Sequence, residues 1–228
     1  MSVQTQGRIA GCVYLTVVVS GIFALAWAPR QLIVVGDPVQ TLDNLQSDFR
    51  LFEAMIAGTL IMAAFFQALP FSLARFLSPV GPGVARLMVA LVALSIPATL
   101  LAVMSYGELA SQIASETATL ESLADARTGY RRWIGVSTVF WGLWLAPLGW
   151  LILRSRSLPR LLGVFLLVGS AGYLVDYFVP MLIPVYREWP ISQWVTLPAS
   201  VGELGTCVWL LLFGARPPAP GSAAVSIP

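Results

Sequence analysis

The stretch Leu161–Ile183, LLGVFLLVGSAGYLVDYFVPMLI, decides the fold, because it is apolar along its whole length apart from Asp176. A helix needs about 20 apolar residues to cross the hydrocarbon core of a bilayer, and this run is long enough. Helices are the spanning structure to expect, since the alternating pattern of β-barrel strands is not visible. Five more apolar runs have a similar length: Ile9–Ala28, Leu51–Leu69, Val84–Met104, Trp133–Leu153 and Val195–Phe213. The sequence therefore predicts an all-α, polytopic membrane helix bundle of about six transmembrane helices.

The composition excludes most other classes of protein. Hydrophobic residues make up 57% and charged residues 11% of the 228 residues, and the mean hydropathy is +0.81. A soluble domain carries about 25% charged and roughly 45–50% apolar residues. The chain is therefore too apolar for a soluble globular enzyme or a disordered protein, and its composition does not fit a disulfide framework. We expect a single transmembrane helical domain over residues 1–213 and a disordered Pro/Gly-rich tail over residues 214–228.

Missing residue types limit the chemistry that the chain can perform. Its basic residues are all arginine, and it has no histidine and no lysine. Without histidine there is no imidazole ligand for haem, zinc or chlorophyll, and no Ser-His or Cys-His base. Without lysine, a retinal Schiff base and a P-loop are excluded. Cys12 and Cys207 lie in apolar runs and are interpreted as small core residues. We expect no catalytic residue, no metal and no ligated cofactor, which leaves a lipid or pigment held by apolar contacts.

The charges of the loops predict the orientation in the membrane. If the N-terminus lies inside, the short Arg154–Arg160 connection is cytoplasmic and the long polar connections lie outside. The outer segments then carry most of the acidic residues. The inner segments carry arginines and no acid: Arg8, Arg75, Arg86, Arg154, Arg156, Arg160 and Arg216. Both termini are therefore predicted to face the cytoplasm.

Two of the outer connections are long. Pro29–Arg50 contains the turn signal Gly36-Asp37-Pro38, followed by a short helix that Thr41 can cap. In Ser105–Arg132, apolar residues recur on one side: Leu109, Ile113, Leu120 and Leu123. We expect this second connection to form an amphipathic helix that lies on the outer membrane surface, between the third and fourth spans.

Three acidic residues lie within the predicted spans, and each needs a reason, because a charge at the bilayer centre costs about 2.5–3.5 kcal/mol on insertion scales. Asp176 and Glu203 are about equally far along the chain from Trp189, so we expect them to face each other in the outer half. This candidate buried polar pair is either structural glue between helices or a pocket that binds a cation or relays a proton. Glu53 and its neighbour Arg50, near the outer interface, are only secondary candidates, because Glu53 can be accommodated simply by reaching interfacial water.

Short motifs follow one another along the chain: Arg8-Ile9-Ala10-Gly11 with Tyr14-Leu15, Gly21-Ile22-Phe23-Ala24, Leu32-Ile33-Val34-Val35-Gly36-Asp37, Leu51-Phe52, Leu158-Pro159-Arg160-Leu161-Leu162-Gly163, Gly172-Tyr173-Leu174-Val175-Asp176, Gly202-Glu203-Leu204 and Trp209-Leu210-Leu211. Through these motifs the chain, except for its tail, resembles a bacterial membrane family known as domain of unknown function 4386. The resemblance implies a bundle of six or seven helices without an assigned reaction, in which Asp176 and Glu203 belong to the family pattern. Glu53 departs from that pattern, so the resemblance gives it no shared role.

Two functions fit these features. The first is a non-enzymatic accessory or scaffolding subunit of a larger membrane complex of the respiratory or photosynthetic type, since catalytic residue types are missing and the third and fourth spans are apolar all round. The second is a small membrane transporter or lipid-handling protein that uses an outer-half polar pocket around Asp176 and Glu203. In both cases the expected partners are the lipid bilayer and other membrane subunits rather than nucleic acid, and the expected location is the bacterial inner membrane.

Overall fold

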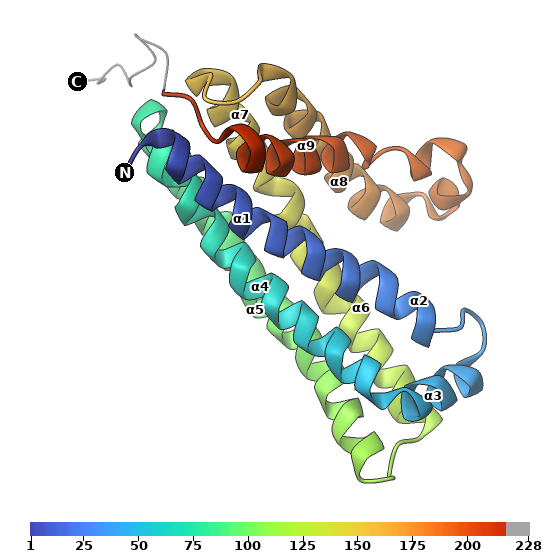
Figure 1. Cartoon of the computed structure of the whole chain (residues 1–228). Helices are drawn as coiled ribbons and strands as arrows, with labels where there is room; N and C mark the ends of the chain where they lie inside the picture. The colour runs from blue at the N-terminus through green and yellow to red at the C-terminus, as the bar shows by residue number, and fades with distance from the viewer. Residues whose placement is uncertain (218–228) are drawn as a thin grey trace. The chain divides into compact units, whose positions relative to one another are not determined.

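The structure, a computed structural model, describes residues 1–217 and is all-helical, with no strand in that range (Figure 1). It confirms six segments that are long and apolar enough to cross a membrane. The six segments are Val3–Leu32, Phe49–Val80, Pro82–Ala114, Leu120–Ser155, Arg160–Leu182 and Pro190–Phe213. Most of them are longer than the predicted spans, because the helices continue beyond the apolar runs. Of the predicted disordered tail, residues 214–217 are not helical, and residues 218–228 lie outside the described residues. The side of the membrane that each terminus faces stays a prediction.

The α-helices are numbered as in Figure 1: α1 (Val3–Gly21), α2 (Ala28–Leu32), α3 (Pro38–Ser47), α4 (Phe49–Leu77), α5 (Pro82–Ala114), α6 (Leu120–Leu143), α7 (Leu145–Ser155), α8 (Arg160–Leu182) and α9 (Leu197–Phe213). A π-helical turn at Ile22–Trp27 joins α1 to α2, and 3-10 turns lie at Ser78–Val80, Pro184–Glu188 and Pro190–Gln193.

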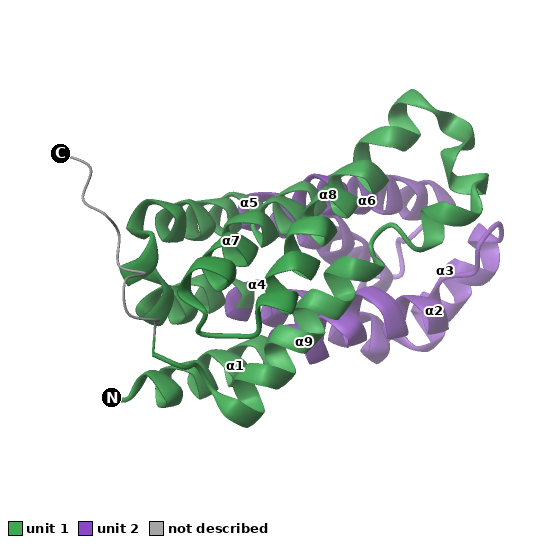
Figure 2. Cartoon of the chain, turned by 90° about the horizontal axis from the view of Figure 1, so that it is seen from above, with its two compact units in different colours: residues 1–15, 66–95, 138–228 green, residues 16–65, 96–137 purple. Residues whose placement is uncertain are grey.

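The chain divides into two compact units (Figure 2). Unit 1 comprises residues 1–15, residues 66–95 and the chain from 138 onward, and unit 2 comprises residues 16–65 and 96–137. Helices α1, α4, α5 and α6 contribute residues to both units. The single domain expected over residues 1–213 stays a prediction.

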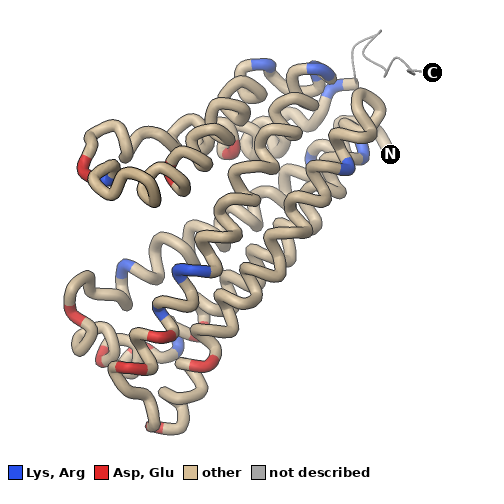
Figure 3. The backbone as a smooth tube through the Cα atoms, turned by 180° about the vertical axis from the view of Figure 1, so that it is seen from behind, with Lys and Arg blue, Asp and Glu red and all other residues tan. Residues whose placement is uncertain are grey.

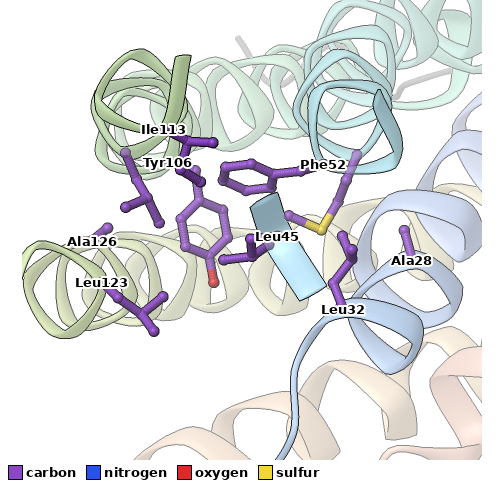
Figure 4. Close-up of a cluster of buried hydrophobic side chains, with 10 residues drawn as sticks. Ala28, Leu32, Leu45, Phe52, Tyr106, Ile113, Leu123 and Ala126 are labelled. Carbon is purple, nitrogen blue, oxygen red and sulfur yellow. The ribbon is translucent and has the colours of Figure 1, made fainter. Parts of the chain in front are cut away.

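Unit 2 has its own hydrophobic core, formed by α2, α3 and the parts of α4, α5 and α6 that belong to it (Figure 4). The Tyr106 ring of α5 lies edge-on to Phe52 of α4, with ring centroids 5.6 Å apart, and stacks on Tyr130 of α6 at 4.1 Å. Leu32 and Leu123 are buried in the same cluster. Burial of each large apolar side chain contributes about 1.5–3 kcal/mol, so this cluster fixes the short helices α2 and α3 against the long ones.

The short helix of the first connection is present, but Thr41 is not its cap. Helix α3 begins at Pro38, and its N-cap is Asp37, whose Oδ1 accepts a hydrogen bond of 2.9 Å from the Gln40 backbone N–H. Proline is favoured in this first helical position, because its missing N–H has no partner to lose there. Thr41 is buried inside the helix instead, and its hydroxyl accepts from the Val34 N–H at 3.0 Å.

We expect Asp37→Ala to lower the free energy of unfolding by about 1 kcal/mol, because the first turn of α3 loses its capping acceptor. Unfolding in mixed micelles of dodecyl maltoside and sodium dodecyl sulfate, followed by circular dichroism, measures this change. Gln46→Ala is the matched control, because Gln46 is exposed on the same helix. Equal stability of the two variants would show that the cap contributes nothing.

The second connection differs from the single surface-lying helix predicted for Ser105–Arg132. Helix α5 continues to Ala114 and α6 begins at Leu120, so this segment is the ends of two long helices and the turn between them. Glu116 takes a left-handed conformation with φ 57°, and the Thr117 N–H donates to the Gln112 carbonyl at 2.9 Å, which closes the end of α5. Thr119 and Ser122 then cap α6 reciprocally through their hydroxyls and backbone N–H groups. Three of the predicted apolar positions are buried in the unit 2 core rather than against a membrane surface: Leu109, Ile113 and Leu123.

Glycines set the packing of unit 1. Helices α8 and α9 pack closely through glycines: a Cβ at Gly169 would overlap the backbone of Ala199, and a Cβ at Gly202 would lie 3.0 Å from Leu166. Gly163 instead faces α7, where a Cβ would lie 2.8 Å from the Gly149 carbonyl oxygen. Small residues at such contacts let helix backbones approach closely, which is the main source of helix association in lipid.

Candidate functional site

The candidate site is in unit 1, around Glu203 of α9. Its Oε1 accepts a hydrogen bond of 3.3 Å from the hydroxyl of Tyr14, which lies on α1 and is 2% exposed. Glu203 itself is partly buried. Among the residues that the structure describes, no arginine lies within ion-pair distance of this carboxylate. Glu203 therefore has a hydroxyl partner but no counter-charge from the protein.

The N-terminal part of α1 explains why Tyr14 reaches Glu203. Gly7, Gly11 and Tyr14 lie on one face of the helix, because their spacing of four and three residues brings them into one line. A Cβ at Gly11 would lie 2.7 Å from the Leu211 backbone nitrogen, and a Cβ at Gly7 would overlap Ala215. Two glycines thus bring α1 against α9 and place the phenol on the carboxylate.

Aromatic rings form one side of the site. The Trp144 ring is fully buried and lies edge-on to Tyr14, with centroids 6.2 Å apart, and to Phe66 of α4 at 5.1 Å. Trp144 stands at the break between α6 and α7. The break follows from Pro147, which has no N–H to donate to the Leu143 carbonyl. A backbone carbonyl released in this way is a typical cation ligand in the broken helices of transporters.

Several buried polar atoms in unit 1 have no hydrogen-bond partner among the described residues: Gln67 Oε1, Trp141 Nε1, Trp144 Nε1 and Thr206 Oγ1. Thr206 lies one helical turn after Glu203 and is fully buried, and Trp144 contacts Tyr14. A buried polar group that is left unpaired costs about 1–3 kcal/mol. Of these groups, Thr206 is on the same helix as Glu203, and Trp144 packs on the tyrosine that donates to its carboxylate.

Asp176 of α8 lies in a different environment. Its Oδ1 is 3.9 Å from an Arg187 guanidinium nitrogen, and the same guanidinium donates to the Asp176 carbonyl at 3.5 Å. The side chains are 31% and 65% exposed, so this is a surface ion pair. Such pairs contribute about 0–1 kcal/mol. Asp176 is thus compensated by an arginine, whereas Glu203 is not.

The structure does not bring Asp176 and Glu203 together at one depth. Gly202 meets Leu166, and from Leu166 to Asp176 the helix rises by about 15 Å. The expectation of a facing pair counted residues outward from Trp189 as though the connection were a symmetric hairpin. Instead, the 3-10 turns Pro184–Glu188 and Pro190–Gln193 fold back beside the end of α8, which extends past the start of α9.

The secondary candidates lie in unit 2. Glu53 and Arg50 are both exposed near the start of α4, and the described part of the chain gives neither of them an ion-pair partner. Within residues 1–217 there is likewise no group of three or more His, Cys, Asp or Glu side chains that could hold a metal ion. Of the three acidic residues predicted within the spans, Glu203 is the one that accepts a hydrogen bond from a buried tyrosine and has no basic partner among the described residues.

One known protein family matches this chain. The model of the family described as domain of unknown function (DUF4386) matches residues 9–214, which is nearly the whole chain. The chain belongs to the DUF4386 family. No curated protein and no solved structure matches it. The matched range includes the site residues Tyr14, Trp144 and Glu203 of this DUF4386 protein.

Sequence reasoning on this DUF4386 chain missed Tyr14, Trp144 and Thr206 as members of the site. One signal was present: Gly7 and Gly11 form a small-xxx-small motif, and Tyr14 follows on the same helix face. That motif predicts a close helix partner for this face but does not say which helix it is. Trp144 and Thr206 carry no comparable signal, since an aromatic or a threonine in an apolar run is ordinary core packing.

We expect Tyr14→Phe to lower the free energy of unfolding by about 0.6–1.7 kcal/mol, the range for a hydrogen bond between membrane helices. The ring and its packing on Trp144 stay, so the change reports the contact between the hydroxyl and Glu203. Unfolding in mixed micelles measures it. Tyr177→Phe is the control, because no hydrogen bond of that hydroxyl is seen in the described part of the chain. The contact would have no energetic weight if the two variants were equally stable.

Proposed function

We propose that the protein is a small multi-pass transporter of the bacterial inner membrane that binds a small cation, the proton included, at Glu203. The observation that carries the proposal is the environment of this carboxylate, which lies in a membrane span with a tyrosine hydroxyl and no basic residue beside it. An acidic residue in a span is costly unless a proton, a cation or a basic group neutralises it. For Glu203 the protein supplies no basic group, so a mobile cation is the remaining partner.

The neighbours of Glu203 fit a cation better than an anion. The carboxylate and the Tyr14 hydroxyl are oxygen ligands, and Thr206 places a third oxygen one turn along the same helix. The carbonyl released by Pro147 adds a backbone oxygen in the segment that carries Trp144. Oxygen donors of these kinds are the ligands of hard monovalent and divalent cations.

Helix α8 carries two polar side chains, Tyr173 and Asp176, beyond the level at which Leu166 meets Gly202 of α9. Asp176 is partly exposed and is held by Arg187. Tyr173 and Asp176 are one helical turn apart on the same face of α8. We therefore assign to Asp176 the role of an outer station, where a cation meets the protein before it reaches Glu203.

The test uses purified protein in vesicles loaded with a pH-sensitive dye, with a potassium diffusion potential to drive protons inward. Parallel vesicles measure the uptake of radioactive sodium or rubidium ions. We expect one of these fluxes to exceed the leak of protein-free vesicles, since a path through the protein lowers the cost of moving a charge across the hydrocarbon core. Fluxes equal to the leak for all three cations would contradict the proposal.

A second proposal is that the protein is an accessory subunit of a larger membrane complex of the respiratory or photosynthetic type. It is supported by the apolar surface of α8, whose exposed side chains include Leu161, Val164, Val168 and Phe178. Such a surface suits a protein partner as well as it suits lipid. Purification from the native membrane in mild detergent tests this role. A large assembly would support it, and a monomer or dimer would contradict it.

A further inference from the structure

Four segments that are far apart in the sequence meet at one end of unit 1. The start of α1 lies against the chain after α9, since a Cβ at Gly214 would lie 2.9 Å from the Gln4 side chain. The Arg216 N–H donates to the Ser157 carbonyl at 3.0 Å, which joins this end to the connection between α7 and α8. A Cβ at Gly81 would lie 2.7 Å from the Trp150 ring, which joins the turn between α4 and α5 to α7.

These four segments carry the densest positive charge of unit 1 (Figure 3). We define the basic end by seven arginines, all of them exposed: Arg8, Arg75, Arg86, Arg154, Arg156, Arg160 and Arg216. None of the four segments contains an acidic residue. In α9, the nearest acidic residue is Glu203, which lies about 15 Å before the end of the helix at Phe213. The charge of the basic end is therefore not neutralised by the described residues of unit 1.

The side chains around the basic end are those of a membrane interface. The Arg154 guanidinium lies over the Trp150 ring, 5.6 Å from its centroid, and that of Arg216 lies over the Trp209 ring at 5.3 Å. Tryptophan is enriched at the level of lipid headgroups. Arginine binds phosphate through two parallel hydrogen bonds, which lysine cannot do.

We propose that the basic end binds the phosphate groups of anionic phospholipids. Arginines from four segments surround the helix ends, so one layer of headgroups can neutralise them together. A cluster of four to eight basic residues next to a membrane span is the usual sequence pattern for anionic lipid recognition. The bound lipids would tie the four segments together at the membrane surface. This function is independent of the cation site at Glu203.

The test is native mass spectrometry of delipidated protein, offered phosphatidylglycerol and phosphatidylcholine with the same acyl chains in equal amounts. We expect the wild-type protein to retain phosphatidylglycerol on the order of ten-fold more than phosphatidylcholine, since each basic residue near the membrane surface attracts the anionic headgroup. The triple variant Arg75→Gln, Arg86→Gln, Arg160→Gln should lower this preference several-fold. These three arginines are exposed on three different helices, so the substitutions leave the packing intact.

The matched control is the triple variant Arg30→Gln, Arg50→Gln, Arg131→Gln, which removes three exposed arginines from unit 2. It should keep the preference of the wild-type protein. Inorganic phosphate in large excess should not displace the lipid, whereas 1 M salt should weaken the preference by screening. An equal loss in both variants, no lipid preference in the wild-type protein, or displacement by inorganic phosphate would each overturn the proposal. The salt and phosphate measurements use the wild-type protein, so they decide the matter even if a variant fails to fold.

Discussion

Glu203→Gln should abolish cation flux in vesicles while the protein stays folded. Glutamine keeps the size of the side chain and a hydrogen-bond acceptor for Tyr14, but it removes the negative charge that the cation neutralises. Without that charge the site no longer attracts a cation, so the flux should fall to the leak of protein-free vesicles. Size-exclusion chromatography and circular dichroism verify that the variant is folded.

The matched control for this variant is Glu53→Gln. Glu53 is exposed near the start of α4 and belongs to unit 2, so its loss should leave the flux unchanged. Glu203→Asp, which restores the charge on a shorter side chain, should recover part of the flux. The assignment of the site to Glu203 fails if Glu203→Gln transports at the wild-type rate, or if Glu53→Gln loses as much activity.

The second large effect concerns the packing of α8 on α9. Gly169→Ala should destabilise the protein by about 1–3 kcal/mol, because the added methyl group overlaps the backbone of Ala199, which cannot turn away as a side chain can. The same contact positions α9 and therefore Glu203. Unfolding in mixed micelles measures the stability change, and we also expect this variant to have a lower cation flux.

Gly83→Ala is the control for that substitution. Gly83 is on α5 in unit 1, and a Cβ there would meet no heavy atom within 4 Å. Alanine favours the helical state by about 0.5–1 kcal/mol relative to glycine, so this variant should be as stable as the wild-type protein or more so. If Gly169→Ala unfolds no more easily than Gly83→Ala, close packing at this glycine does not hold the two helices together.

The number of membrane-spanning helical segments could be predicted from the sequence, because each apolar run is long enough to cross the bilayer. The ends of the helices could not be predicted in this way. Helix α5 continues beyond Met104 through a polar stretch to Ala114, since the apolar face of that stretch is buried in the unit 2 core. The start of α6 was missed as well, because Ser105–Arg132 was interpreted as one helix, whereas Thr119 and Ser122 cap a new helix within it.

The candidate site was predicted only in part. Glu203 stood out because an acidic residue in a span needs a reason, and that argument uses one residue alone. The partner of the Glu203 carboxylate depends on which helices are neighbours and on the register in which they pack. The connection between α8 and α9 folds into two 3-10 turns. Counting residues along it therefore gave the wrong register between the two helices, and Asp176 does not lie opposite Glu203. The contact with Tyr14 depends on α1 meeting α9, which no pattern within either helix specifies.

Infrared difference spectroscopy of the protein in vesicles tests the central claim, that Glu203 exchanges a cation. A protonated carboxyl group has a carbonyl band in the infrared spectrum. This band vanishes when the group releases its proton to the solvent, either because the pH is raised or because an incoming cation takes the place of the proton. We predict such a band, which decreases when the pH is raised or when the transported cation is added. The change should be present in Glu53→Gln and absent in Glu203→Gln. A band that does not respond to either condition, or one that responds equally in Glu203→Gln, would contradict the assignment.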